Sequence, residues 1–208
     1  MQLVFIHGWA FHAGVWERTA VRLAHRDPVF LDLGFVRNGP RAVGRFPENA
    51  VYVGHSFGVL WLLKHGPRAM RALVSIAGFD CFHAFADAGA IDAMKSGMER
   101  NPEAQLRAFW RTCGSGVFAD REATDIATLK AGLDWLAGWD ERERRRALDC
   151  PVLALASKDD TVVPYAASRE MWAGADLRTT PTGGHGLPLT EPEWCAEQIE
   201  EFLRGLEP

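Results

Sequence analysis

The hydrophobic positions of the 208-residue chain fall into two kinds of segment. Short continuous apolar runs, each followed by glycine or polar residues, are typical of parallel strands buried on both faces. These runs occupy positions 3–6, 29–33, 50–53, 72–77 and 151–156, and a last strand is expected near 177–180. Segments with apolar residues at helical spacing lie between them, at 15–24, 59–63 and 165–172. The alternation predicts an α/β fold with a mostly parallel, doubly wound sheet of about six strands.

One long segment, 79–138, breaks this alternation. It contains no strand-like run, and its helical patterns recur at 90–99, 103–112 and 125–136. A long helical insertion at the carboxyl edge of a parallel sheet is typical of a lid. We therefore expect a core made of 1–78 and 139–208 and a helical lid made of 79–138.

Two short stretches outside the expected lid predict a loop and the start of a helix. The stretch 34–49 is rich in Gly, Pro and Arg and has no clear periodicity, which predicts a loop. Near the end of the chain, Thr190 is followed three residues later by Glu193. This spacing predicts a capping box at the start of a closing helix.

The sequence Gly54-His55-Ser56-Phe57-Gly58 joins the third apolar run to the helix that follows it. This G-x-S-x-G pattern between a strand and a helix predicts a nucleophile elbow with Ser56 at its tip. Glycines two residues away on either side leave room for a strained turn. The serine hydroxyl would then project from the carboxyl edge of the sheet.

Two further polar residues follow later strands, and the chain order is serine, aspartate, histidine. We expect Ser56 to be the nucleophile and His185, in a glycine-rich loop, to be the base that takes its proton. A buried carboxylate would hold the imidazole in the required tautomer. Asp160 is the preferred residue for this role, and Asp159 is the alternative because a shift of one residue in the turn exchanges them.

The first apolar run ends at His7-Gly8-Trp9-Ala10. We expect the backbone amides of Trp9 and Phe57 to form an oxyanion hole, since both follow strands at the same edge. His7 is interpreted as a structural residue that bonds this loop, with a catalytic role as the less favoured alternative. Several of the eight Trp and twelve Phe residues are expected to line an apolar pocket, although core packing alone is the commoner explanation for aromatic residues.

Composition narrows the class of protein. A net charge of −4 argues against a nucleic-acid binder. No apolar run reaches membrane-spanning length and no secretory leader is evident, so a cytoplasmic monomer with no membrane association is expected. The four scattered cysteines show no zinc-type spacing. The predicted chemistry requires no metal and no organic cofactor.

With these residues in hand, the chain resembles the α/β-hydrolase superfamily over nearly its whole length. Within it, the chain is most similar to the pimeloyl-[acyl-carrier protein] methyl ester esterases of biotin synthesis. The similarity is carried by the elbow and by short motifs: His7-Gly8-Trp9-Ala10, Val15-Trp16, Cys81-Phe82, Asp160 before Pro164, and His185 before Glu191-Pro192-Glu193. The amino-terminal antiparallel strands common in the superfamily have no counterpart in the sequence.

The resemblance implies hydrolysis of the methyl ester of a pimeloyl chain attached to acyl carrier protein. It also implies lid arginines that hold the acidic carrier and aromatic residues that guide the acyl chain. By position, Arg107 and Arg111 are the candidates for the first purpose, although ordinary surface charge explains them equally well. The candidates for the second purpose are Trp9, Phe79, Phe82 and Phe109.

Other functions fit the same residues. A general short-chain carboxylesterase or thioesterase would use the same three side chains with a different lid. A carbon-carbon hydrolase or a cofactor-free perhydrolase is also compatible. From a different class, a non-catalytic hydrolase-fold protein could sense a small ligand, although binding alone does not need a serine, histidine and aspartate together.

Overall fold

The computed structural model describes residues 1–36, 46–87, 89–116 and 123–207. Six parallel strands form one sheet in the order β2-β1-β3-β4-β5-β6. The strands are β1 (Leu3–Ile6), β2 (Pro28–Leu31), β3 (Val51–His55), β4 (Ala72–Ile76), β5 (Val152–Ser157) and β6 (Asp176–Thr180). The predicted α/β fold with a doubly wound parallel sheet is confirmed, and each apolar run lies on a strand.

Burial explains why these runs are continuously apolar. Every residue of β1, β3 and β4 is buried, because helices cover both faces of the sheet at its centre. The edge strands β2 and β6 are only partly buried. The strand order reverses direction between β1 and β3, and ligands of such sheets bind beyond the carboxyl ends of the strands at this switch point.

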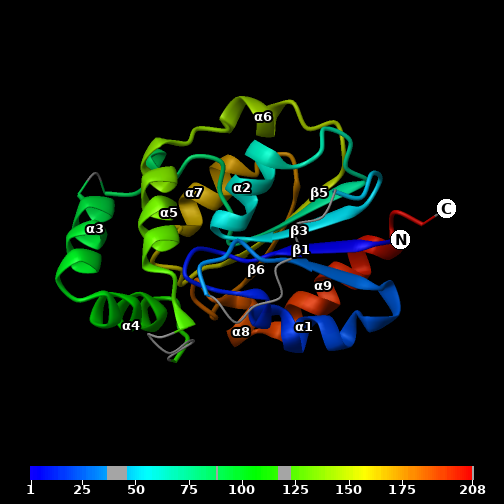
Figure 1. The fold of residues 1–208 in the computed structure, drawn as a ribbon. Coiled ribbons are helices and arrows are strands. Elements are labelled where there is room, and N and C mark those ends of the chain that lie inside the picture. Colours follow the sequence, from blue (N-terminus) through cyan, green and yellow to red (C-terminus); the bar gives the residue numbers. More distant parts are fainter. Residues whose placement is uncertain (37–45, 88, 117–122, 208) are drawn as a thin grey trace.

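Helices lie on both faces of the sheet (Figure 1). α1 (Glu17–Arg22), α8 (Leu187–Thr190) and α9 (Pro192–Arg204) are on one side. α2 (Phe57–His65), α6 (Arg142–Arg146) and α7 (Tyr165–Met171) are on the other. The single helix expected at 15–24 is divided into a 3₁₀ turn at Ala13–Trp16, α1, and a second 3₁₀ turn at Ala24–Arg26.

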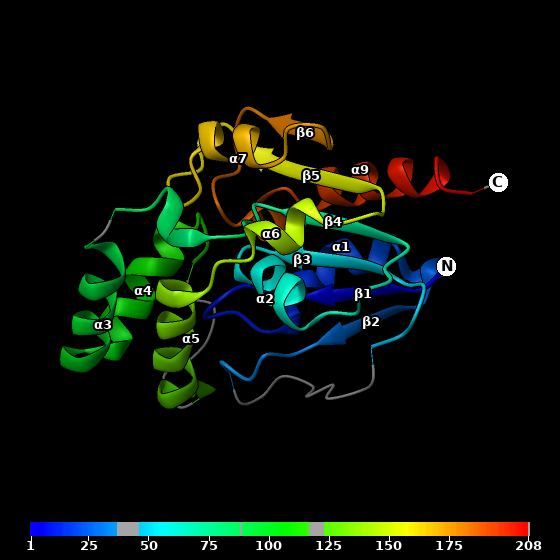
Figure 2. The same cartoon turned by 90° about the horizontal axis from the view of Figure 1, so that it is seen from above.

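The segment between β4 and β5 is helical, as its periodicity indicates. A short 3₁₀ turn at Phe82–Ala84 is followed by α3 (Ala90–Arg100), α4 (Pro102–Thr112) and α5 (Ile126–Gly138). These three helices stand together beyond the carboxyl ends of the central strands (Figure 2). Position 88, positions 117–122 and positions 37–45 of the expected loop lie outside the described residues. The description of 79–138 as a lid stays a prediction.

The predicted capping box at Thr190 is wrong. Helix α9 begins at Pro192, and its N-cap residue Glu191 makes no side-chain capping bond. Thr190 belongs to the short helix α8, and its hydroxyl donates to the carbonyl of Gly183, with an oxygen-to-oxygen distance of 2.7 Å. The proline starts α9 one residue later than the spacing suggests, because its fixed φ suits the first helical position.

Within the part of the chain that the structure describes, no helix is both long enough and apolar enough to cross a membrane.

Candidate active site

Ser56 sits on the sharp turn between β3 and α2. Its φ of 53° is in the left-handed region, which a residue with a side chain adopts only when the surroundings impose it. Its N–H donates to the carbonyl of Ile76 on β4 (2.9 Å), which fixes the turn against the neighbouring strand. A side chain at Gly58 would lie 2.5 Å from the carbonyl oxygen of Ile6, and one at Gly54 would collide with Val59. Both glycines are therefore required by close packing.

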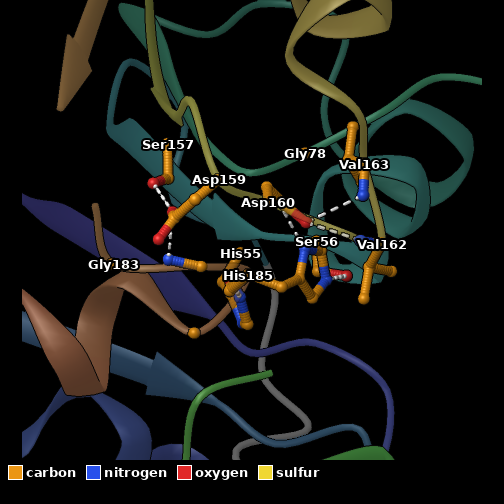
Figure 3. A network of polar contacts seen from close by, with 12 residues as sticks. His55, Ser56, Gly78, Ser157, Asp159, Asp160, Val162, Val163, Gly183 and His185 are labelled. Atoms are coloured by element: carbon orange, nitrogen blue, oxygen red, sulfur yellow. Dashed lines mark hydrogen bonds and ion pairs between the residues drawn. The ribbon is translucent and has the colours of Figure 1, made fainter. Parts of the chain in front are cut away.

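Three side chains from three loops form a continuous hydrogen-bonded chain. The Oγ of Ser56 lies 2.7 Å from Nε2 of His185, and Nδ1 of His185 lies 2.9 Å from Oδ2 of Asp160 (Figure 3). His185 is completely buried, Asp160 is 7% exposed and Ser56 is 6% exposed. The structure therefore brings together the three residues chosen from the sequence.

The environment of Asp160 favours the ionised carboxylate. Burial alone would raise its pKa, but the adjacent imidazole of His185 and hydrogen bonds outweigh burial and lower the pKa below its ordinary value. Its second oxygen, Oδ1, accepts bonds from the backbone N–H groups of Val162 (2.8 Å) and Val163 (2.9 Å). An ionised, fully bonded carboxylate fixes the orientation of the His185 ring.

Asp159, the alternative acid, contacts the loop that carries His185. Its carboxylate accepts a bond from the N–H of Gly184 (2.8 Å) and another from the hydroxyl of Ser157. The hydrogen bonds from Ser157 and Gly184 lower the pKa of Asp159. The sequence did not predict this contact, because only the folded loops bring Gly184 to Asp159.

His55, which directly precedes Ser56, is hydrogen-bonded to the backbone of His185. Its Nε2 lies 2.9 Å from the backbone carbonyl oxygen of His185 and donates to it. Burial, followed by repulsion from His185, lowers the pKa of His55 to about 3. The ring is therefore neutral at physiological pH. It holds the His185 backbone without adding a second positive charge beside the imidazole.

The loop after β1 approaches Ser56 closely. A side chain at Gly8 would lie 3.1 Å from Cβ of Ser56. His7 donates from Nδ1 to the carbonyl of Gly8 (2.9 Å) and accepts at Nε2 from the N–H of Leu33 (2.9 Å), so both ring nitrogens bind the backbone. These contacts agree with the structural interpretation of His7. Phe57 is the first residue of α2, where backbone N–H groups lack partners within the helix.

A cavity of about 410 Å³ opens at the serine. Trp9, Ser56, Phe57, Phe79, Phe82 and Phe109 line it, together with apolar residues of α3, α4 and α5. The four aromatic residues expected from the sequence to guide an acyl chain thus surround the serine. Arg107 and Arg111 are exposed on α4 and do not line the cavity, and Arg107 pairs with Glu103 at 2.8 Å.

One cluster of metal-ligating side chains lies away from this cavity. Ligand atoms of Cys81, His83 and Asp140 are within 4.8 Å of one another. However, the guanidinium of Arg142 bonds both carboxylate oxygens of Asp140 and neutralises its charge. Burial also raises the pKa of the Cys81 thiol, which disfavours the thiolate that binds metals. The three side chains therefore already have protein partners: Cys81 and His83 contact each other at 3.2 Å, and Asp140 pairs with Arg142.

A family model described as "Alpha/beta hydrolase family" matches residues 3–198. The chain belongs to the alpha/beta hydrolase family. The prediction of this superfamily is confirmed. The roles of Ser56, Asp160 and His185 stay predictions.

Curated relatives in this family cover almost the whole chain. A pimeloyl-[acyl-carrier protein] methyl ester esterase of Pectobacterium atrosepticum is 27% identical over 98% of this chain and 94% of its own length. A protein of the same name from Aeromonas hydrophila is 28% identical over 97% of this chain and 94% of its own length. The expected likeness to this group of esterases is therefore confirmed.

Solved structures of other proteins share the fold. An esterase from Exiguobacterium antarcticum superposes with a TM-score of 0.81 at 17% identity, over 98% of this chain and 92% of its own. A bromoperoxidase from Bacillus anthracis gives 0.80 at 17% identity, over 98% and 91%. At such identities the likeness concerns the fold alone.

Proposed function

We propose that the protein is a serine carboxylic ester hydrolase. The observation that carries this proposal is the hydrogen-bonded chain from Ser56 through His185 to Asp160, with its serine end open to an apolar cavity. This arrangement supplies a nucleophile, a base and an orienting carboxylate in the required sequence. The names of the curated relatives support the same class of reaction.

The reaction would proceed through an acyl-enzyme. His185 accepts the hydroxyl proton as Oγ of Ser56 attacks the ester carbonyl, and the negative charge that develops on the carbonyl oxygen is stabilised by the backbone N–H groups of Trp9 and Phe57. The imidazolium then protonates the departing alcohol as the carbon–oxygen ester bond breaks. Water, deprotonated by His185, attacks the acyl-enzyme; as the bond between the acyl carbon and Oγ breaks, the imidazolium returns this proton to Oγ, which releases the acid and regenerates Ser56 and neutral His185.

At a finer level, the proposed substrate is the methyl ester of pimeloyl-[acyl-carrier protein], a step of biotin biosynthesis. The names of the relatives support this substrate, and so does a predominantly apolar cavity, because a pimeloyl chain presents methylene groups between its two ends. Phe79, Phe82 and Phe109 would contact these methylenes. Arg107 and Arg111 would meet the acidic carrier outside the cavity.

One observation favours a broader alternative. The cavity of about 410 Å³ is large enough to enclose a small ester without any carrier, and no Lys or Arg lines it among the described residues. A general short-chain carboxylesterase or thioesterase would use the same three side chains. Dependence on chain length and on the carrier separates this alternative from the pimeloyl substrate.

The test is complementation of a bacterial strain that lacks its pimeloyl methyl ester esterase, on biotin-free medium. We expect the parent gene to restore growth and Ser56→Ala to fail. The matched control is Ser75→Ala, because Ser75 lies on the adjacent strand β4 and outside the cavity. Growth with the control but not with Ser56→Ala would support both the nucleophile and the pathway.

Absence of growth with the soluble parent protein would reject the carrier-linked substrate. The purified parent and Ser56→Ala proteins would then be compared on p-nitrophenyl esters of two to eight carbons. Serine-dependent hydrolysis there would support the broader esterase, whereas equal rates for the two proteins would reject the serine hydrolase mechanism itself.

A further inference from the structure

Helix α4 is hydrogen-bonded to the loop that follows β1. The indole Nε1–H of Trp110 donates to the carbonyl of Ala10 at 3.1 Å, and the side chain of Trp110 is buried. The two residues are 100 positions apart in the chain. Trp110 does not line the cavity. Its indole therefore contacts the loop rather than a substrate.

The carbonyl held by Trp110 is linked to the amide of Trp9 through one turn. The Ala10–Phe11 peptide unit contains both the carbonyl of Ala10 and the N–H of Phe11. This N–H donates to the carbonyl of Gly8 at 3.3 Å, and the same carbonyl also accepts a bond from Nδ1 of His7 at 2.9 Å. The carbonyl of Gly8 belongs to the same planar peptide unit as the N–H of Trp9, and the two point in opposite directions. Fixing the Gly8 carbonyl therefore fixes the direction of the Trp9 N–H.

The turn needs such support because of its conformation. Ala10 has a φ of 61°, in the left-handed region that an alanine disfavours. A residue keeps this conformation only when surrounding contacts impose it. The bond from Trp110 is such a contact, and it comes from outside the loop itself.

A second hydrogen bond joins the same loop to the helical segment, and here the loop supplies the donor. The indole Nε1–H of Trp9 donates to the carbonyl of Leu129 on α5 at 2.8 Å. Gly132 on α5 leaves space for the ring, since a side chain there would lie 2.6 Å from Cδ1 of Trp9. The loop is therefore bonded to both α4 and α5.

We propose that Trp110 is a positioning residue that holds the Gly8–Phe11 turn so that the Trp9 amide faces the oxyanion formed at Ser56. This role rests on the proposed serine hydrolase function. It makes the oxyanion hole dependent on α4: the catalytic loop has its full activity only when this helix is packed against it. A donor aimed correctly before the reaction stabilises the transition state more than the bound substrate.

The test substitutes Trp110→Phe, which keeps an aromatic ring and removes the N–H donor. The matched control is Trp172→Phe. Trp172 is also buried, and its indole also donates to a backbone carbonyl, that of Gly78 at 3.2 Å, but not in the oxyanion loop. For each protein, kcat and KM are measured on p-nitrophenyl butyrate, together with the rate of Ser56 labelling by a fluorophosphonate.

We expect Trp110→Phe to lower kcat and the labelling rate by roughly ten- to a hundredfold while KM changes by less than about threefold, since a misdirected donor loses part of the effect of a deleted one. Trp172→Phe should stay within about threefold of the parent. Adding Ala10→Gly should restore part of the activity of Trp110→Phe, because glycine adopts the left-handed φ without support.

Three results would overturn the proposal. The first is an unchanged labelling rate in folded Trp110→Phe. The second is an equal loss in Trp172→Phe. The third is failure of both Trp110→Phe and the double variant to fold, which would assign Trp110 to stability alone. A parent protein that is neither active nor labelled would instead reject the serine hydrolase function, and the positioning role with it.

Discussion

The hydrogen-bonded series Ser56–His185–Asp160 and the exposed face of α4 that carries Arg107 differ in how firmly their polar side chains are held. Around Ser56 the polar side chains are buried, and they form hydrogen bonds with backbone groups whose positions are fixed. Asp160, for example, accepts bonds from the amides of Val162 and Val163. On α4 the pair Arg107–Glu103 is exposed to solvent, and such pairs contribute little to stability. The fold therefore holds the polar groups around Ser56 in fixed positions and leaves those on the exposed face of α4 less constrained.

The largest expected effect on kcat comes from removing the side chain of Ser56 or of His185. Ser56→Ala and His185→Ala should each lower kcat on p-nitrophenyl butyrate by about 10⁵- to 10⁶-fold, as for triad deletions in another serine hydrolase. The double variant should be no slower than either single variant, because the two groups act as a unit. Steady-state kinetics measures all three, and losses that multiply would contradict this linked action.

The two neighbouring aspartates provide the next comparison. Asp160→Asn should lower kcat by about 10⁴-fold, because the amide leaves His185 in the wrong tautomer. Asp159→Asn should lower it by only about tenfold, through a loosened bond to the N–H of Gly184. Kinetics on the same ester measures both. A larger loss in Asp159→Asn than in Asp160→Asn would reverse the assignment of the acid.

Burial around Ser56 also affects stability, because His55 makes the free energy of unfolding depend on pH. Its pKa of about 3 in the folded protein is below the ordinary value of 6.5, so below pH 6.5 the unfolded chain takes up a proton that the folded protein does not. The free energy of unfolding therefore falls with acid by about 1.4 kcal/mol per pH unit, with the full contribution restored above pH 6.5.

Replacing His55 by Gln removes this titration and keeps an N–H donor. Urea unfolding between pH 4 and pH 7 should show a flatter dependence in His55→Gln than in the parent. The pKa values of His12 and His65 are also lowered, and both residues remain in the variant, so the difference in slope reports His55 alone. Parallel curves for the two proteins would contradict the buried neutral state.

The smallest expected effect belongs to the exposed face of α4. Reversing the charge in Arg107→Glu together with Arg111→Glu should lower kcat/KM for a carrier-linked methyl ester by about three- to tenfold at low salt. The rate on a free methyl ester should not change, because neither residue lines the cavity. Equal rates with the carrier-linked ester would remove these arginines from recognition.

The elbow and the strands were predictable because their signals are local. The G-x-S-x-G pattern and the apolar runs each lie within a few consecutive residues, so Ser56 and the six strands follow from short stretches of sequence. The order serine, aspartate, histidine was also sufficient to choose His185. Topology then places the ends of these strands at one edge of the sheet.

The remaining features depend on contacts between distant segments. The preference for Asp160 over Asp159 could not be settled from spacing, because the turn geometry decides which carboxylate reaches His185. The bond from Trp110 to Ala10 has no signal in either segment alone. The capping box at Thr190 was wrong because Thr190 ends α8 and Pro192 begins α9, so Glu191 and not Thr190 is the N-cap residue.

The space at Gly132 has a consequence for recombining members of the family. Trp9 lies in the loop after β1, whereas Gly132, which leaves space for its ring, lies in α5 of the helical segment. A chimera that receives its helical segment from a relative with any side chain at this position would force the Trp9 indole out of place. Exchange of this segment between homologues therefore requires that the tryptophan and the glycine be inherited as a pair.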